Sequence, residues 1–87
     1  MAYRIEFTPR AEKQFKALEK STQIRLARRI NSLANNPRPQ GVKKLESEED
    51  FYRVRVGDYR VVYQIRDKAL VVLIVRIGHR SEVYRGI

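Results

Sequence analysis

Residues 51–65 read FYRVRVGDYRVVYQI, and this stretch decides the fold. Side chains switch faces at every residue of a strand, so the alternating pattern predicts two strands joined by a tight turn at Gly57-Asp58. In such a hairpin the register predicts four opposed pairs: Val56 with Tyr59, Arg55 with Arg60, Val54 with Val61, and Arg53 with Val62. One face then carries the apolar set Tyr52, Val54, Val56, Tyr59, Val61 and Tyr63. The opposite face carries Arg53, Arg55 and Arg60.

Two of these arginines, Arg55 and Arg60, face each other directly in the predicted register. Like charges opposed across a strand pair are destabilising. A fold with no use for them would avoid that arrangement. The simplest reason to keep it is an anion that sits between them, so this sheet face is the first candidate for a functional site.

The chain has 87 residues and no cysteine. That length suits one domain, and we expect a single domain over residues 1–87. Without thiols there is no disulfide framework and no thiolate metal site. The N-terminus lacks the long apolar segment of a secretory signal, and the longest apolar run, Ala69–Val75, is too short to span a bilayer. We therefore expect a cytoplasmic protein with no membrane partner.

The formal net charge is +9, and it is unevenly distributed. Residues 1–50 hold eleven Lys or Arg against seven Asp or Glu, a charge of +4, while residues 51–87 hold eight against three, a charge of +5. In the second stretch every basic residue except Lys68 is arginine, which binds phosphate oxygens through two parallel hydrogen bonds. Scattered basic charge is typical of a soluble surface, whereas charge gathered on one sheet face favours a polyanion partner.

The N-terminal residues predict a strand followed by a helix. Tyr3–Phe7 alternates apolar and charged residues, as a half-buried strand does. Thr8 and Pro9 are typical of a helix start, with Thr8 as the N-cap and Pro9 at the first helical position. The apolar spacing carries this helix to about Glu19.

A second helix is predicted between Ser21-Thr22, which we expect to cap it, and Asn35-Asn36-Pro37, which ends it because a residue before proline resists the helical conformation. Its expected apolar stripe is Ile24, Ala27, Ile30, Leu33 and Ala34. The short link between the helices favours an antiparallel hairpin. Off the stripe lie three arginines that we interpret chiefly as a solvated surface: Arg25, Arg28 and Arg29.

The rest of the chain predicts strands. Val42–Leu45 is expected to form a short edge strand, followed by an acidic loop over residues 46–50 and then the hairpin. A second tight turn is expected at Asp67-Lys68. The last strand, Ala69–Ile77, is apolar at nearly every position and is therefore buried on both faces or central. The predicted order is β-α-α-β-β-β-β, an α+β fold with the helical hairpin packed on one face of a mainly antiparallel sheet.

The segment after the last strand, Gly78–Tyr84, carries an imidazole, a guanidinium and a phenol. Cleaving RNA without a metal requires that the 2′-OH lose a proton, that charge on the phosphate be stabilised and that the leaving 5′-oxygen gain a proton. The sheet arginines suit the second task. Tyr84 is a candidate base, since neighbouring guanidinium groups favour the phenolate, although a tyrosine near the terminus more often simply packs on the sheet edge. His79 and Arg80 are candidate acids, with Arg80 also a candidate phosphate ligand, and a lone histidine in a turn is more often structural or exposed.

No cluster of His, Cys, Asp and Glu has metal-ligand spacing, and the sequence has no glycine-rich phosphate loop. We therefore expect no metal and no nucleotide cofactor.

The sequence resembles the RelE toxins of the RelE/ParE superfamily, the toxin halves of bacterial and archaeal toxin–antitoxin pairs. The resemblance covers essentially the whole chain and is strongest over residues 51–63 (FYRVRVGDYRVVY) and 77–84 (IGHRSEVY). It implies a RelE-like fold and an endoribonuclease that enters the ribosomal A site and cuts mRNA there, leaving a 2′,3′-cyclic phosphate and a 5′-OH. The roles that it implies are RNA binding by Arg53 and Arg55, transition-state stabilisation by Arg60, leaving-group chemistry by Arg80 and base chemistry by Tyr84.

Two departures from the RelE pattern affect these roles. That pattern has lysines where this chain has Arg53 and Arg55, so no deprotonatable amine is present there. The segment between Gly78 and Ser81 is also shorter. Arg80 therefore matches either of two basic residues of the pattern, and His79 stays open as the acid.

The resemblance also implies partners. An acidic, RelB-like antitoxin is expected to wrap the toxin, to cover apolar side chains such as Val71, Leu73 and Val75, and to block the catalytic segment. The ribosome and mRNA are the other expected partners. Operator DNA is expected to be bound only through the toxin–antitoxin complex.

Rival interpretations stay open at this point. A ParE-like gyrase inhibitor shares the fold but lacks the nuclease residues, and the presence of Arg60, Arg80 and Tyr84 together argues against it. A non-catalytic RNA-binding module would stack bases on exposed aromatic side chains, which are scarce on the predicted arginine face. A toxin that has lost its activity is the third alternative.

Overall fold

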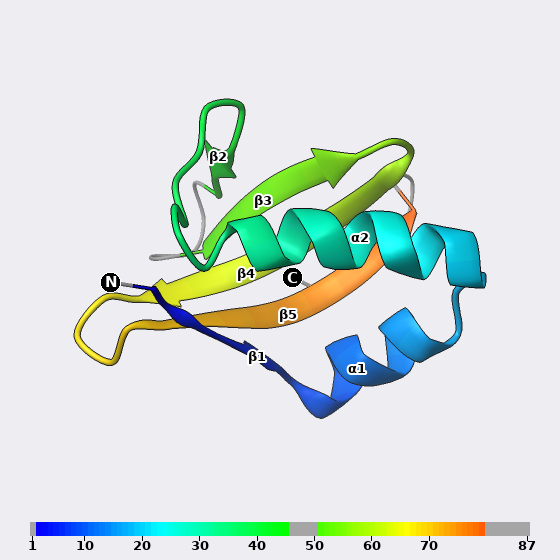
Figure 1. Cartoon of the computed structure of the whole chain (residues 1–87), viewed down its shortest axis with the longest axis horizontal. Coiled ribbons are helices and arrows are strands. Elements are labelled where there is room, and N and C mark those ends of the chain that lie inside the picture. The colour runs from blue at the N-terminus through cyan, green and yellow to red at the C-terminus, as the bar shows by residue number, and fades with distance from the viewer. Residues whose placement is uncertain (1, 46–50, 80–87) are drawn as a thin grey trace.

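The computed structural model describes residues 2–45 and 51–79, which form two layers, a five-stranded sheet and a pair of helices (Figure 1). The elements follow along the chain as β1 (Arg4–Phe7), α1 (Pro9–Lys16), α2 (Lys20–Ser32), β2 (Lys43–Lys44), β3 (Phe51–Val56), β4 (Tyr59–Arg66) and β5 (Val71–His79). The strands lie side by side in the order β1-β5-β4-β3-β2. Among these strands β1 and β5 are parallel, and the other neighbours are antiparallel. The predicted α+β fold and element order are confirmed.

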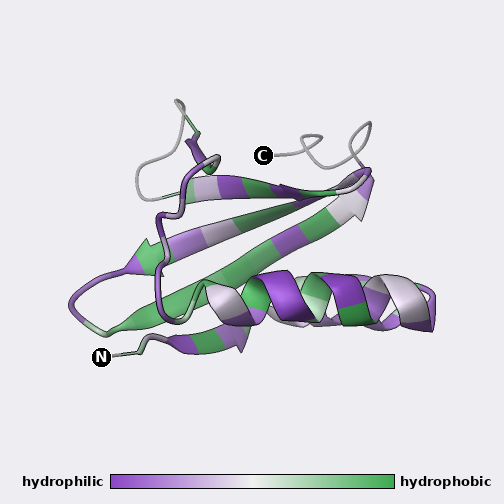
Figure 2. Ribbon diagram, turned by 45° about the horizontal axis from the view of Figure 1, so that its top comes forward, coloured by the Kyte–Doolittle hydropathy of each residue, from purple (hydrophilic) through white to green (hydrophobic). Residues whose placement is uncertain are grey.

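Both helices lie on one face of the sheet (Figure 2), and the apolar strand β5 is an interior strand, between β1 and β4. The predicted central position of this strand is confirmed. Its bounds differ from the prediction, since β5 begins at Val71 and ends at His79. The turn before it occupies residues 67–70, with Leu70 at a positive φ of 55°, so the expected two-residue turn at Asp67-Lys68 is wrong.

Helix α1 begins as the sequence predicts and ends earlier. Thr8 is extended, with ψ of 158°, and its hydroxyl accepts a hydrogen bond from the Ala11 N–H at 3.1 Å. Pro9 occupies the first helical position, where its missing N–H is not needed. The helix ends at Lys16 rather than near Glu19, because Glu19 is already in the extended conformation (ψ 150°) that precedes the next helix.

Helix α2 begins at Lys20, and its N-cap residue, Glu19, makes no side-chain capping hydrogen bond. The predicted cap at Ser21-Thr22 is therefore wrong, because both residues lie inside the first turn. The buried face is also rotated from the predicted one. Leu26 is fully buried whereas Ile24 is 52% exposed, since residues two positions apart lie on nearly opposite sides of a helix. Other members of the predicted stripe are buried or half-buried: Ile30, Leu33, Ala27 and Ala34.

The two helices are joined by residues 17–19 and run in roughly opposite directions (Figure 1). The predicted antiparallel helical hairpin is confirmed. Helix α2 ends at Ser32, ahead of the Asn35-Asn36-Pro37 segment that was expected to end it.

A β-bulge interrupts β5 at Val75. Tyr63 of β4 pairs with Ile74, but the preceding residue, Val62, pairs with Arg76, so the ladder skips one residue. The bulge changes the face on which every later residue of β5 lies.

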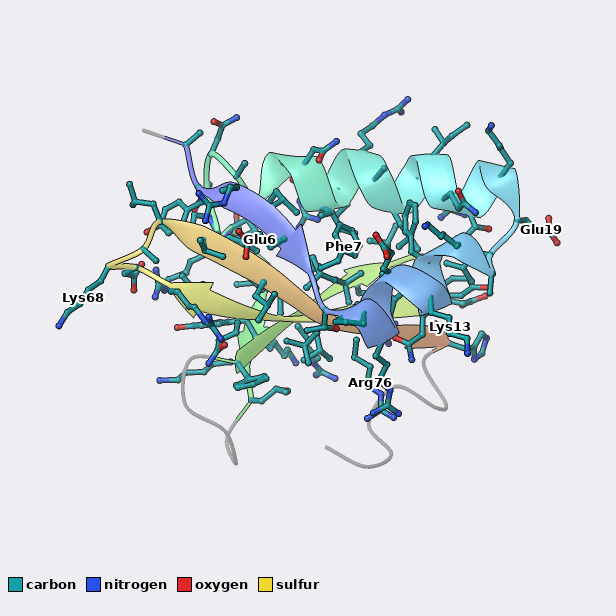
Figure 3. All side chains as sticks on the ribbon, turned by 90° about the horizontal axis from the view of Figure 1, so that it is seen from below. Glu6, Phe7, Lys13, Glu19, Lys68 and Arg76 are labelled. Carbon is teal, nitrogen blue, oxygen red and sulfur yellow. The ribbon has the colours of Figure 1, made fainter. Side chains whose placement is uncertain are left out.

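The bulge determines the face of the sheet on which Arg76 lies. Alternate residues of a strand share a face, so without the bulge Arg76 would follow Ile74 into the core. With it, Ile77 enters the core instead. Figure 3 shows Arg76 pointing away from the helices, to the opposite side of the sheet.

The hydrophobic core lies between the helices and the facing side of the sheet. Val54, Val61 and Tyr63 are buried there, and Tyr52, Val56 and Tyr59 pack against them half-buried, which confirms the predicted apolar face of the hairpin. Fully burying one such side chain contributes roughly 1.5–3 kcal/mol. The arginine face of the same hairpin is therefore held in place by the packing of its other side.

Candidate active site

The β3–β4 hairpin has the predicted register. Val56 pairs with Tyr59 around a two-residue turn, and Arg55 pairs with Arg60. Gly57 has a φ of +60°, a left-handed conformation that glycine adopts without strain and that type II′ hairpin turns require at this position. The turn therefore sets the register, and the register sets the face on which each arginine lies.

The three predicted sheet arginines meet at one pocket on the face opposite the helices. Arg53, Arg55 and Arg60 line it together with Gly41 and Lys43, which precede β3 in the chain. The volume of the pocket is about 120 Å³, room for roughly four water molecules. That volume suits a compact anion such as a phosphate group.

The pocket concentrates positive charge. Among the described residues, no Asp or Glu side chain lies within ion-pair distance of Lys43, Arg55 or Arg60. Unit charges about 4 Å apart repel by about 1 kcal/mol even in water, so a cluster of this kind opposes folding. A bound anion removes the repulsion, and guanidinium groups hold phosphate oxygens through paired hydrogen bonds. The arrangement fits a phosphodiester.

One wall of the pocket depends on the segment over residues 35–42, which side chains attach to the sheet. Tyr63 donates a buried hydrogen bond to the carbonyl oxygen of Pro37 at 2.7 Å. Arg38 donates two hydrogen bonds to the carboxylate of Asp67, at 3.2 and 2.9 Å, and its guanidinium carbon lies 5.3 Å from the centre of the Tyr52 ring. These contacts position the chain that leads into β2.

The same contacts change the pKa values of the groups that make them. Hydrogen bonds from Arg38 and then Tyr3 lower the pKa of Asp67. The bond to Asp67 in turn raises the pKa of Tyr3, and bonds to Asp67 and Tyr52 raise the pKa of Arg38. Burial raises the pKa of Tyr63. At neutral pH Asp67 is therefore ionised and Tyr63 is protonated, the states that keep the segment attached.

Towards β5 two residues of the arginine face are buried. Val62 is fully buried and Arg76 is 8% exposed, although the register places both on this face. Burial, and then the charge of nearby Arg10, lowers the pKa of Arg76. Sequence reasoning missed Arg76 because the last strand looks uniformly apolar. The trace of the bulge in the sequence is a change of phase near the end of that strand, too short to recognise beforehand.

His79 lies away from the sheet arginines. It pairs with Tyr59, and the two rings meet edge to face with centroids 6.0 Å apart. Since Tyr59 packs against the core, the imidazole lies on the helix side of the sheet. Gly78 is the β5 residue that pairs with Arg60. The acid–base role of His79 stays a prediction.

Two predicted catalytic residues, Arg80 and Tyr84, lie outside the described residues. Their roles stay predictions as well. Of the charged residues that line the pocket, sequence reasoning missed Lys43, because the register of a two-residue edge strand leaves no pattern in the sequence.

Within residues 2–45 and 51–79, no group of three or more His, Cys, Asp or Glu side chains is placed to hold a metal ion. No helix in that part of the chain has the length and apolar character needed to cross a membrane.

The chain also matches known proteins over nearly its whole length. A family model described as the ParE toxin of the type II toxin–antitoxin system parDE matches residues 5–84. The mRNA interferase toxin RelE of Escherichia coli K12 is 33% identical over 88 residues, an alignment that covers 97% of this chain and 92% of the relative. The chain belongs to the RelE/ParE family of type II toxins.

Solved structures of RelE toxins share this fold. The isolated E. coli RelE toxin has a TM-score of 0.81 at 29% identity, covering 90% of this chain and 84% of that one. RelE in the archaeal RelE–RelB complex from Pyrococcus horikoshii OT3 has a TM-score of 0.81 at 32% identity, covering 95% of this chain and 100% of that one. The RelE-type assignment made from residues 51–63 and 77–84 is confirmed, as is the RelE-like fold.

Proposed function

We propose that this RelE-type toxin is an endoribonuclease that cuts mRNA in the ribosomal A site and uses no metal ion. The observation that carries the proposal is the pocket, where cationic side chains from β2, β3 and β4 converge on a space suited to one phosphate. The E. coli relative is named an mRNA interferase. A phosphodiester is the anion that such an enzyme must hold.

The proposed reaction breaks one bond of the RNA backbone. The 2′-oxygen attacks the adjacent phosphorus and the P–O5′ bond breaks, which yields a 2′,3′-cyclic phosphate and a 5′-OH. A base takes the proton of the 2′-OH, and an acid supplies one to the 5′-oxygen. Negative charge develops on the non-bridging oxygens, and cations already positioned around them lower the barrier. Removing one such group from an enzyme typically slows the reaction by about 10²–10³-fold.

The proposed roles of the pocket residues are those that the RelE resemblance implies. Arg53 and Arg55 on β3 hold the phosphate, and Arg60, opposite Arg55 on β4, stabilises the charge of the transition state. The remaining roles fall on the C-terminal segment: the base on Tyr84, the leaving-group role on Arg80, and an alternative acid on His79.

The proposed protein partner is an acidic antitoxin of the RelB type. RelE toxins have been solved in complex with RelB from E. coli and from P. horikoshii. The net charge of +9 favours an acidic partner. Of the apolar residues expected beneath it, Val71 is 4% exposed and already belongs to the toxin's own fold, while Leu73 and Val75 are half-buried. Operator DNA would be bound through that complex, and the toxin would act in the cytoplasm.

Mapping of RNA ends on a translated message tests the proposal. Wild-type toxin should create new 5′-hydroxyl ends inside the coding region, and none on the same message without a ribosome-binding site. Equal cutting of both messages would contradict ribosome dependence. An intact message together with stalled replication would indicate gyrase inhibition, and RNA binding without new ends would indicate a non-catalytic module.

A further inference from the structure

Lys43 adds a second like-charge pair to the pocket. On β2 it is the register partner of Arg53, and directly opposed residues of neighbouring strands point to the same face of a sheet. The Lys43–Arg53 pair thus repeats the Arg55–Arg60 arrangement one strand further out. Both pairs line the same pocket, and opposed like charges are destabilising in each. An anion bound in the pocket lies close to both pairs.

The two ends of the row of side chains that crosses the sheet through Arg53 differ in exposure. Val62 and Arg76 continue the row of Lys43 and Arg53 across the sheet, and both are buried. Lys43, at the other end of this row, is exposed on the edge strand. A nucleic-acid strand that enters the pocket from the β2 edge along this row passes Lys43.

Backbone contacts hold Lys43 in place although β2 has only two residues. Both residues of β2 pair with β3, and the Leu45 N–H donates to the Phe51 carbonyl oxygen at 2.9 Å. Upstream, Gly41 turns the chain with a φ of +91°, a conformation that favours glycine, and lines the pocket with its backbone. The segment before it is held by the Tyr63 and Arg38 contacts described above.

We propose that Lys43 is a phosphate-binding residue that holds the RNA backbone on the β2 side of the phosphate that is cut. The inference rests on the proposed function, because it assigns Lys43 a role at the same site. An ammonium group on a flexible stem attracts phosphate as a point charge from many directions, which suits the guiding of a strand into a site. The rigid guanidinium forks of the three arginines suit the holding of the reacting phosphate.

Lys44 provides a matched control on the same strand. It has the same charge and is also exposed. It pairs with Tyr52, whose side chain packs against the core, so Lys44 points to the helix side and away from the pocket. K43Q and K44Q change the net charge equally, so any difference between them reports position rather than total charge.

The experiment measures the binding of a short single-stranded RNA by fluorescence anisotropy over a series of salt concentrations. The RNA has 2′-O-methyl riboses, so that it cannot be cut. One phosphate contact on a single strand contributes about 0.7 to the slope of log K against log salt concentration. K43Q should reduce the magnitude of the slope by about this amount. K44Q should leave the slope nearly unchanged, K43R should restore it, and equal Tm values would show that all variants fold.

Equal slopes for K43Q and K44Q would overturn the assignment, as would a wild-type toxin whose RNA binding does not depend on salt. The outcomes also separate this inference from the proposed function. A salt slope that is reduced in K43Q but not in K44Q, with no cleavage of translated mRNA by the wild type, would support Lys43 as a phosphate ligand and refute the nuclease. Cleavage of translated mRNA by the wild type, with equal slopes for K43Q and K44Q, would support the nuclease and refute Lys43 as a phosphate ligand.

Discussion

Replacing Arg55 with glutamine should raise the free energy of unfolding of the toxin at low salt while it removes a group from the phosphate pocket. Arg55 and Arg60 are directly opposed on β3 and β4. Two unit charges about 5 Å apart repel by about 0.8 kcal/mol in water. Cross-strand charge pairs typically change stability by roughly 0.2–1 kcal/mol, so the expected gain lies in that range. The same substitution should weaken RNA cleavage, because the charge that opposes folding is the charge that holds the phosphate.

Urea denaturation at low and high salt is the assay, because only the charge effect depends on screening. The Debye length falls from about 30 Å at 0.01 M to about 3 Å at 1 M salt, so the gain should largely disappear at high salt. Arg66→Gln is the control: Arg66 lies on the same face of β4 but pairs with Val71, so no opposed charge is relieved. Equal increases in the free energy of unfolding at low salt for Arg55→Gln and Arg66→Gln would refute the reasoning. A loss of stability in Arg55→Gln at low salt would show instead that the arginine stem packs on the sheet.

Three further predictions test the structure around the pocket. Leu26→Ala empties a fully buried site and should lower the free energy of unfolding by roughly 2–5 kcal/mol, whereas Ile24→Ala, at a 52% exposed position, should change it by less than about 0.5 kcal/mol in urea denaturation. Because Arg38 lowers the pKa of Asp67, the carboxylate stabilises the fold above its unfolded pKa of about 3.9, and this stabilisation is lost as the pH falls through the lower folded value. The difference in Tm between the wild type and Asp67→Asn should therefore shrink as the pH is lowered to about 3, and a constant difference would contradict the role of the ion pair. Gly57→Ala should lower the free energy of unfolding by roughly 1–2 kcal/mol, since a φ of +60° strains a residue that has a Cβ, whereas the nearby end of the flexible Arg25 side chain can move aside; an unchanged Tm would contradict this strain.

The sheet arginines could be placed from the sequence because the rules that place them act over a few residues. The Gly57-Asp58 turn and the alternation around it determine the register of the hairpin, and hence the face of Arg53, Arg55 and Arg60. The start of α1 was predictable for the same reason, since an N-cap and a following proline act locally.

The features that the sequence did not reveal depend on contacts between distant segments. Ile24 and Leu26 are both apolar, and the sheet decides which of them is buried. The bulge at Val75 turns Arg76 out of the core, and its trace in the sequence is a shift in phase too short to recognise beforehand. Lys43 reaches the pocket because the segment before β2 is bound to β4 and to the turn after it, which involves residues far apart in the chain.

The rate of mRNA cleavage by Arg60→Gln in a reconstituted translation reaction tests the central claim most directly, namely that the β3–β4 pocket stabilises charge on a phosphate that is being cut. Arg60→Gln should cut at least about 100-fold more slowly than the wild type, the usual effect of removing one group that stabilises a developing oxyanion. Arg66→Gln, which removes the same charge from the same face outside the pocket, should cut at close to the wild-type rate. An Arg60→Gln toxin that cuts translating mRNA as fast as the wild type would contradict the account.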